Sequence, residues 1–171
     1  MKTRILIFLI IVFVIGTGVF GVYKLCDTTR LLIGDDINRI GQNINIDMPK
    51  GEVKKVVDSV GWRGEGILLY TVSFSDDSFL KDIKVNSDWV SKLTKYMEVL
   101  MNGNETMEPI LVYEDGSSIF EKRFKNAYYF VKDKNNNKKE IGELEKAYSY
   151  DIIMAVYDVD NRKLYYCEYD T

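Results

Sequence analysis

The stretch Gly61–Gly66, with the sequence GWRGEG, places three glycines around a tryptophan, an arginine and a glutamate. A glycine-rich loop of this kind could cradle a phosphate. Phosphate-binding and dinucleotide-binding loops, however, lie between a strand and a helix N-terminus and follow a fixed glycine order. That order is absent here, and the next segment, Ile67–Ser75, has the β-branched and aromatic composition of a strand. We therefore interpret GWRGEG as a tight connection between two strands, in which glycines supply positive φ angles.

The side chains of this connection also form a candidate binding site. Trp62, Arg63 and Glu65 would be displayed on a rigid loop, and a large aromatic residue beside an arginine is typical of contact surfaces. Turn formation is the favoured interpretation of the segment, and a binding role for these three side chains is the alternative.

Carboxylates near expected turns suggest a second kind of chemistry. The pairs Asp76-Asp77 and Glu114-Asp115, together with Glu65, lie where a cleft could form. A glycoside hydrolase needs two carboxyl groups about 5–10 Å apart across the sugar. The sequence does not supply that distance, so solvated turn residues are the favoured interpretation and a carboxylate-dependent hydrolase is the alternative.

Two further motif fragments are incomplete. Ser78-x-x-Lys81 fits the S-x-x-K nucleophile motif, but the K-T-G motif of that enzyme class is absent. Part of a calcium-binding loop is matched by the oxygen-bearing side chains of Asp158, Asp160 and Asn161. That loop also needs a central glycine and a distant glutamate, and Arg162 and a strand-like segment follow instead. The sequence therefore predicts a hairpin turn after Asp158 and no catalysis at Ser78.

The chain of 171 residues contains no histidine and two cysteines. The lack of histidine excludes Ser-His-Asp and Cys-His catalysis and the HExxH zinc motif. Cys26 and Cys167 are too few for a disulfide scaffold or a cysteine-based zinc site. We interpret Cys167 as a small buried hydrophobic residue, with a Cys26–Cys167 disulfide as the alternative. No metal and no cofactor is predicted.

The N-terminus predicts a membrane location. Ile5–Tyr23 is a run of nineteen residues without a charge, which as a helix just spans a hydrocarbon core of about 30 Å. Lys2 and Arg4 precede it, so the positive-inside rule places the N-terminus in the cytoplasm and the rest of the chain outside. The favoured interpretation is a retained anchor in the lipid bilayer. The alternative is a signal peptide cleaved after Gly21, which would give a secreted protein.

Charge narrows the choice of partner for the exported part. Two of the 23 basic residues precede the apolar run, so residues 24–171 carry 21 basic and 26 acidic side chains, a net charge of −5. An acidic domain is a poor nucleic-acid binder and is not drawn to anionic lipid by net charge. We expect no nucleic-acid partner.

The pattern of the remaining residues predicts an α+β fold. One amphipathic helix is expected over Trp89–Met101, capped by Asn86, Ser87 or Asp88 and ended by Asn102-Gly103. A short helix is expected over 140–147. Strands are predicted at Val53–Val60, Ile67–Ser75, Pro109–Gly116 and Asn126–Asp133, and in a final hairpin of Tyr150–Asp158 with Lys163–Thr171. These elements indicate an antiparallel sheet with the one main helix packed on it. The expected division is an anchor at 1–24, a spacer at 25–48 and a domain at 49–171.

Two motifs carry a resemblance. The loop GWRGEG before a strand, together with the ending YDVDNRKLYYCEYDT, resembles a group of small, N-terminally membrane-anchored proteins of Gram-positive bacteria, over residues 49–171 and most weakly in the middle. The resemblance implies a shared domain outside the cell membrane, and it carries over no functional residue and no activity.

Three functional hypotheses remain from the sequence. The first is a single-pass membrane protein whose extracytoplasmic domain binds a protein or cell-wall partner without catalysis. The second is a carboxylate-dependent hydrolase acting on cell-wall polymer. The third is an immunity or regulatory partner of another membrane protein.

Overall fold

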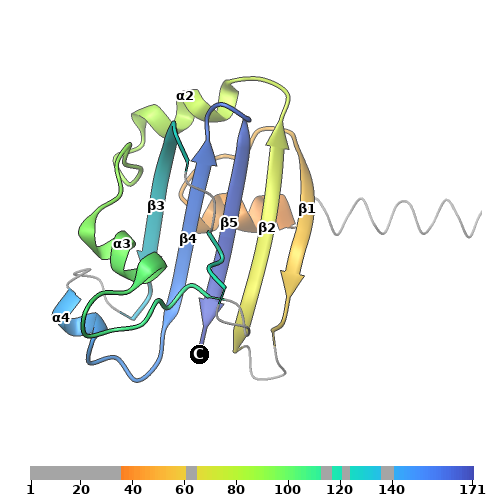
Figure 1. Cartoon of the computed structure of the whole chain (residues 1–171). Coiled ribbons are helices and arrows are strands. Elements are labelled where there is room, and N and C mark those ends of the chain that lie inside the picture. The colour runs from red at the N-terminus through yellow and green to blue at the C-terminus, as the bar shows by residue number, and fades with distance from the viewer. Residues whose placement is uncertain (1–35, 61–64, 113–116, 121–123, 136–140) are drawn as a thin grey trace, which may run out of the picture. The chain divides into compact units, whose positions relative to one another are not determined.

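The computed structural model describes residues 36–60, 65–112, 117–120, 124–135 and 141–171 (Figure 1). The chain divides after Asn38, and Arg39–Thr171 forms one compact unit. A helical segment that ends at residue 43 precedes the first strand. The elements that follow are β1 (Gly51–Asp58), β2 (Gly66–Phe74), α2 (Ser78–Val85), α3 (Lys95–Asn102), β3 (Ala127–Asp133), α4 (Ile141–Leu144), β4 (Asp151–Asp158) and β5 (Lys163–Asp170).

The strands form one five-stranded antiparallel sheet in the order β1-β2-β5-β4-β3. The β4–β5 hairpin occupies its centre, with Met154 opposite Cys167. Asp158 closes the hairpin turn by accepting hydrogen bonds from the backbone N–H and the side-chain Nδ2 of Asn161, at 3.3 and 2.6 Å. The structure therefore confirms both the α+β class and the turn expected after Asp158.

One face of the sheet packs against α3. The side chains that alternate onto this face include Ile67, Leu69, Met154 and Cys167, and they share a hydrophobic cluster with Leu100 of α3. The hydroxyl of Thr94 caps the helix by accepting from the Met97 N–H at 3.3 Å. Gly103 ends it in a positive-φ conformation (φ 71°) that favours glycine.

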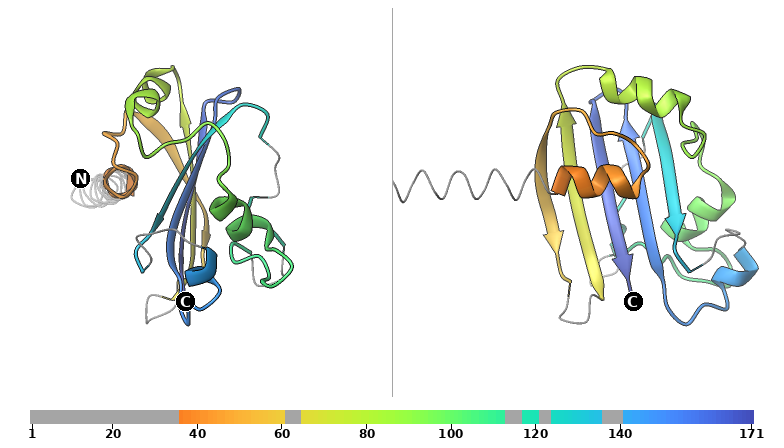
Figure 2. Two further views of the ribbon diagram at one scale, coloured as in Figure 1. Left: turned by 90° about the vertical axis from the view of Figure 1, so that its left-hand side faces the viewer. Right: turned by 180° about the vertical axis from the view of Figure 1, so that it is seen from behind.

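The opposite face packs against residues 39–46. Figure 2 shows residues 39–43 on one face of the sheet, with α3 and α4 on the other and α2 across one end of the strands. Ile40 and Ile44 are both fully buried. Towards the α2 end, this face is filled by an aromatic cluster in which Phe79 contacts Phe74, Tyr157 and Trp89 at ring-centroid distances of 4.6, 5.1 and 6.0 Å.

The expected helix over Trp89–Met101 is correct at its C-terminal end and wrong at its start. The helix begins at Lys95, and Val90 instead bridges to Tyr129 of β3 through two backbone hydrogen bonds of 2.9 and 2.8 Å. Trp89 packs on Phe130, on the face that residues 39–46 cover, whereas Tyr96 belongs to the cluster on the α3 face. The chain therefore crosses the β3 edge at Val90, which a continuous helix could not do.

Other local expectations differ from the structure. Ser78–Val85 forms a helix, α2, in a segment to which the sequence pattern assigned no element. In the segment expected as the strand Pro109–Gly116, the described residues contribute one isolated bridge, Val112 to Ser118. The compact unit Arg39–Thr171 includes Ile40 and Ile44, whose side chains are fully buried. No helix in the described ranges is long and apolar enough to cross a membrane, and Ile5–Tyr23 lies outside those ranges.

Truncating Ile44 tests whether residues 39–46 belong to the folded domain. Because Ile44 is fully buried, Ile44→Ala should lower the free energy of unfolding by about 2–5 kcal/mol. The matched control is Gln42→Ala, at an exposed position two residues away, which should change it by less than about 0.5 kcal/mol. Urea-induced unfolding followed by tryptophan fluorescence measures both, and equal stabilities would contradict the packing described here.

Candidate functional site

The connection between β1 and β2 is held at both ends. The backbone N–H of Ser59 donates to the Ile67 carbonyl at 3.0 Å, and the Ile67 N–H donates to the Ser59 hydroxyl oxygen at 3.1 Å. Gly66 has a φ of 139°, a conformation that side chains rarely allow. A β–β connection that needs a glycine at position 66 is therefore present, as the sequence predicts. Trp62 and Arg63 lie outside the described residues, and Glu65 is exposed.

A pocket of about 500 Å³ opens beside this connection. Its lining combines the apolar residues Ile67, Val112 and Tyr169 with the acidic residues Glu65 and Asp170. Burial is the main cause that raises the Tyr169 pKa above its usual value. The remaining lining residues are Ser59, Gly66 and Thr171. This end of the sheet thus offers an apolar hollow with two acids.

The end of β5 that lines the pocket is fixed by hydrogen bonds. The Thr171 N–H donates to the Tyr150 carbonyl at 2.9 Å, and the Tyr150 N–H donates to the Thr171 hydroxyl oxygen at 3.0 Å. Tyr150 in turn donates from its phenol to the Leu144 carbonyl of α4 at 3.4 Å. The chain end next to Asp170 is therefore held by Tyr150, which is itself held by α4.

The structure separates carboxylates that the hydrolase hypothesis considered together. Glu65 precedes β2 and Asp76 follows it, and the strand between them spans about 26 Å at 3.3 Å per residue. Asp77 pairs with Arg162 at 2.7 Å. Asp76 accepts from the Ser78 N–H at 2.8 Å, and contacts with Ser78 are the main cause that lowers its pKa. Glu114-Asp115 lies outside the described residues.

Asp170 is the carboxylate that the structure places beside Glu65, and sequence reasoning did not select it. The pairing of Gly66 with Asp170 across β2 and β5 brings the two acids to one pocket. Because β2 and β5 are far apart in sequence, the strand pattern does not reveal that they are neighbours. Within the described residues, no three acidic or cysteine side chains come together in a way that could hold a metal ion.

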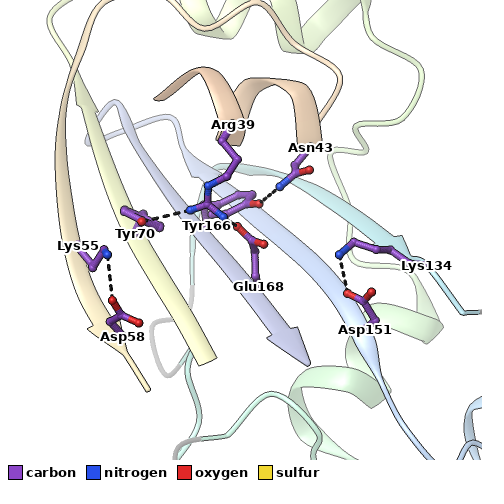
Figure 3. A network of polar contacts seen from close by, with 9 residues as sticks. All are labelled: Arg39, Asn43, Lys55, Asp58, Tyr70, Lys134, Asp151, Tyr166 and Glu168. Carbon is purple, nitrogen blue, oxygen red and sulfur yellow. Dashed lines mark hydrogen bonds and ion pairs between the residues drawn. The ribbon is translucent and has the colours of Figure 1, made fainter. Parts of the chain in front are cut away.

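A polar network on the other side of the sheet ties the N-terminal helical segment to the strands (Figure 3). Arg39 forms an ion pair with Glu168 of β5 and donates to the Tyr70 hydroxyl of β2 at 3.2 Å. Asn43, one turn later, donates to the Tyr166 hydroxyl at 2.6 Å. Burial, followed by the charge of Glu168, raises the Tyr166 pKa above its usual range. Sequence reasoning missed this network.

A signal for the network was present in the sequence. Ile40 and Ile44 stand four residues apart, as do Arg39 and Asn43, which is the spacing of two adjacent rows on a helix. The strands beneath carry further ion pairs, Lys55 with Asp58 at 3.0 Å and Lys134 with Asp151 at 2.7 Å (Figure 3). The side chains of the network contact one another, so we infer that the network holds the helical segment against the sheet.

Cys167 is fully buried in the cluster beneath α3, and its thiol is free. Burial raises the pKa of this thiol to about 12. These observations agree with the interpretation of Cys167 as a small hydrophobic residue. Cys26 lies outside the described residues, so the alternative disulfide stays untested.

Comparison of the chain with protein-family models, curated proteins and solved structures gives no match. The resemblance to membrane-anchored proteins of Gram-positive bacteria therefore stays a prediction.

Replacing Gly66 should disturb the pocket wall. A Cβ at this position would lie 2.4 Å from the Ser59 carbonyl oxygen, so Gly66→Ala should cost about 1–3 kcal/mol of unfolding free energy. The control is Gly142→Ala in α4, where a Cβ meets nothing within 4 Å and helix propensity predicts a neutral or slightly stabilising change. Thermal unfolding of both variants measures the difference, and an equally tolerated Gly66→Ala would contradict the geometry given for this connection.

The Cys167 thiol should be unreactive in the folded protein. With a pKa of about 12 it exists almost entirely as the protonated form at pH 8, and only the thiolate attacks disulfide reagents. In a Cys26→Ser chain, modification by Ellman's reagent should be slowed at least about a hundredfold relative to the same chain in guanidinium chloride. Rapid modification of the native chain would place Cys167 at the surface.

Proposed function

We propose that this protein is a single-pass membrane protein whose extracytoplasmic domain binds a protein or cell-wall partner, without catalysis, at the end of the sheet next to Glu65. The observation that supports this proposal most is the pocket of about 500 Å³ beside the fixed β1–β2 connection. The same connection carries Trp62 and Arg63, whose residue types are common in contact surfaces.

The composition of the pocket favours one kind of ligand group. Glu65 and Asp170 are acidic residues of the lining, and Ile67 and Tyr169 are apolar ones. A lysine or arginine whose aliphatic stem lies along an apolar surface meets both requirements. We therefore infer that the partner presents a basic residue at this site.

The proposed anchor restricts where the partner lies. Residues 24–38 separate the apolar run Ile5–Tyr23 from the folded unit that begins at Arg39. Fifteen residues reach at most about 50 Å when fully extended. With Ile5–Tyr23 in the bilayer, the domain reaches only partners close to the membrane surface.

Protease treatment of intact cells tests the location. We expect a C-terminal epitope tag to be lost while a fragment containing residues 1–24 stays in the membrane. A protected tag would reverse the orientation and remove every extracellular partner. A soluble tagged chain that starts near Val22 would show that the apolar run is a cleaved signal peptide.

Site-specific photocrosslinking tests the binding surface. A photoreactive amino acid at Glu65 should give a discrete adduct with a partner in living cells. The matched control carries the same group at Asp82, which is exposed on α2 at the other end of the sheet. Adduct formation at Glu65 should be lost when Asp170→Asn is added, and equal adducts from both positions would contradict a site at this end.

The pocket also keeps the hydrolase as a second candidate. Glu65 and Asp170 line one pocket, and catalysis by this pair requires their carboxyl groups to lie about 5–10 Å apart across the sugar. Purified wall polymer incubated with the full chain, with Glu65→Gln and with Asp170→Asn separates the candidates. Lysis that both substitutions abolish would establish the enzyme, and the absence of lysis with retained crosslinking would favour the binding domain.

A further inference from the structure

The outer edge of β1 presents backbone hydrogen-bonding groups. Phe74 of β2 donates its N–H to Arg162 on the β5 side, whereas the Ile67 carbonyl accepts from Ser59 on the β1 side. Hydrogen-bonding directions alternate along an antiparallel strand. Because Gly51 is opposite Phe74 and Val53 is opposite Val72, the N–H and C=O groups of Gly51, Val53 and Lys55 point away from β2.

The described part of the chain places no further strand on this side of β1. Glu52 and Lys54 are exposed, and they project from the sheet face opposite that of Val53. The Lys55 side chain turns back over its own sheet, where its Nζ lies 3.0 Å from Asp58 and 5.6 Å from the centre of the Tyr70 ring. Beyond Lys55 a bulge interrupts the strand. A straight edge of five residues, Gly51–Lys55, is thus presented.

We propose that this edge binds the same edge of a second copy of the chain, as an antiparallel pair centred on Val53. In this register, Val53 lies opposite Val53 of the second copy, and Gly51 lies opposite its Lys55. The N–H groups that point outward from each strand then face the outward-pointing C=O groups of the other strand. Gly51 of one copy has no side chain, so it does not obstruct the contact between Lys55 and Asp58 of the other copy.

Charge selects this register over its neighbours. When the pair is centred on Val53, Glu52 of each copy lies opposite Lys54 of the other, which gives two attractive cross-strand pairs. A pair centred on Glu52 would place two glutamates opposite each other, and a pair centred on Lys54 would place two lysines together. The sequence of β1 is therefore complementary to itself at one register.

The geometry is compatible with two chains in one membrane. An antiparallel pair of identical strands is related by a twofold axis perpendicular to the sheet. Both copies then carry residues 39–43 on the same face of the joined ten-stranded sheet. Five paired residues on each side bury less than the roughly 1,200 Å² of a standard stable interface, so the pairing is weak in dilute solution and benefits from confinement.

Cysteine crosslinking of the full chain tests the register. In a Cys26→Ser background, reconstituted in vesicles, Val53→Cys should form a disulfide-linked dimer, because paired Cα atoms lie about 5.5 Å apart. Lys54→Cys is the matched control. Its two copies are offset along the strands by about two residues, which puts their Cα atoms about 8 Å apart and beyond disulfide reach. Equal crosslinking at both positions, or none at Val53→Cys, would overturn the proposal.

Charge reversal tests its energetic basis. Glu52→Lys or Lys54→Glu converts both attractive pairs into repulsive ones, and should lower crosslinking through Val53→Cys by roughly tenfold. The double variant Glu52→Lys/Lys54→Glu restores the opposite charges and should restore crosslinking to within about twofold of the parent. A double variant as poor as the single variants would contradict the pairing, and restoration would also show that the substituted chains fold.

Discussion

Burial of the β4–β5 hairpin on both of its faces is the constraint from which the rest of the fold follows. Every residue from Ile152 to Tyr157 is fully buried, although the side chains alternate between the two faces. A sheet with an apolar centre on both sides is stable in water only when two layers cover it. α3 and the segments around it cover one side, and residues 39–46 with α2 cover the other. The short N-terminal helical segment is therefore part of the core.

Polar groups fix the position of that covering segment. Tyr166 and Glu168 project from the centre of the sheet towards residues 39–43, and each finds its partner there, in Asn43 and in Arg39. A buried polar group that loses its partner costs more free energy than the hydrogen bond contributes when made. The segment is thus placed by apolar burial and its register is set by two polar contacts.

Local patterns determined how much of this fold was predictable. The β4–β5 hairpin was predicted to within a residue at each end, because alternation and an Asp-Asn turn are encoded in adjacent residues. The start of α3 was predicted wrongly, because Trp89 and Tyr96 match helical spacing and yet pack on opposite faces of the sheet. For the same reason the candidate site was predicted only in part. Glu65 was selected from its own loop, whereas Asp170 joins it only through the pairing of β2 with β5.

β1 belongs both to the proposed self-pairing edge and to the proposed binding end, and its bulge separates the two roles. Gly51–Lys55 is the straight part of the strand, and the bulge before Val57 lies between it and Ser59, where the pocket begins. In an antiparallel pair centred on Val53, the two copies of Ser59 lie at opposite ends of the joined edge, about 40 Å apart at 3.3 Å per residue. One compact ligand cannot fill both pockets at once. A dimer built in this way therefore engages two separate partners, or two distant points on one extended partner.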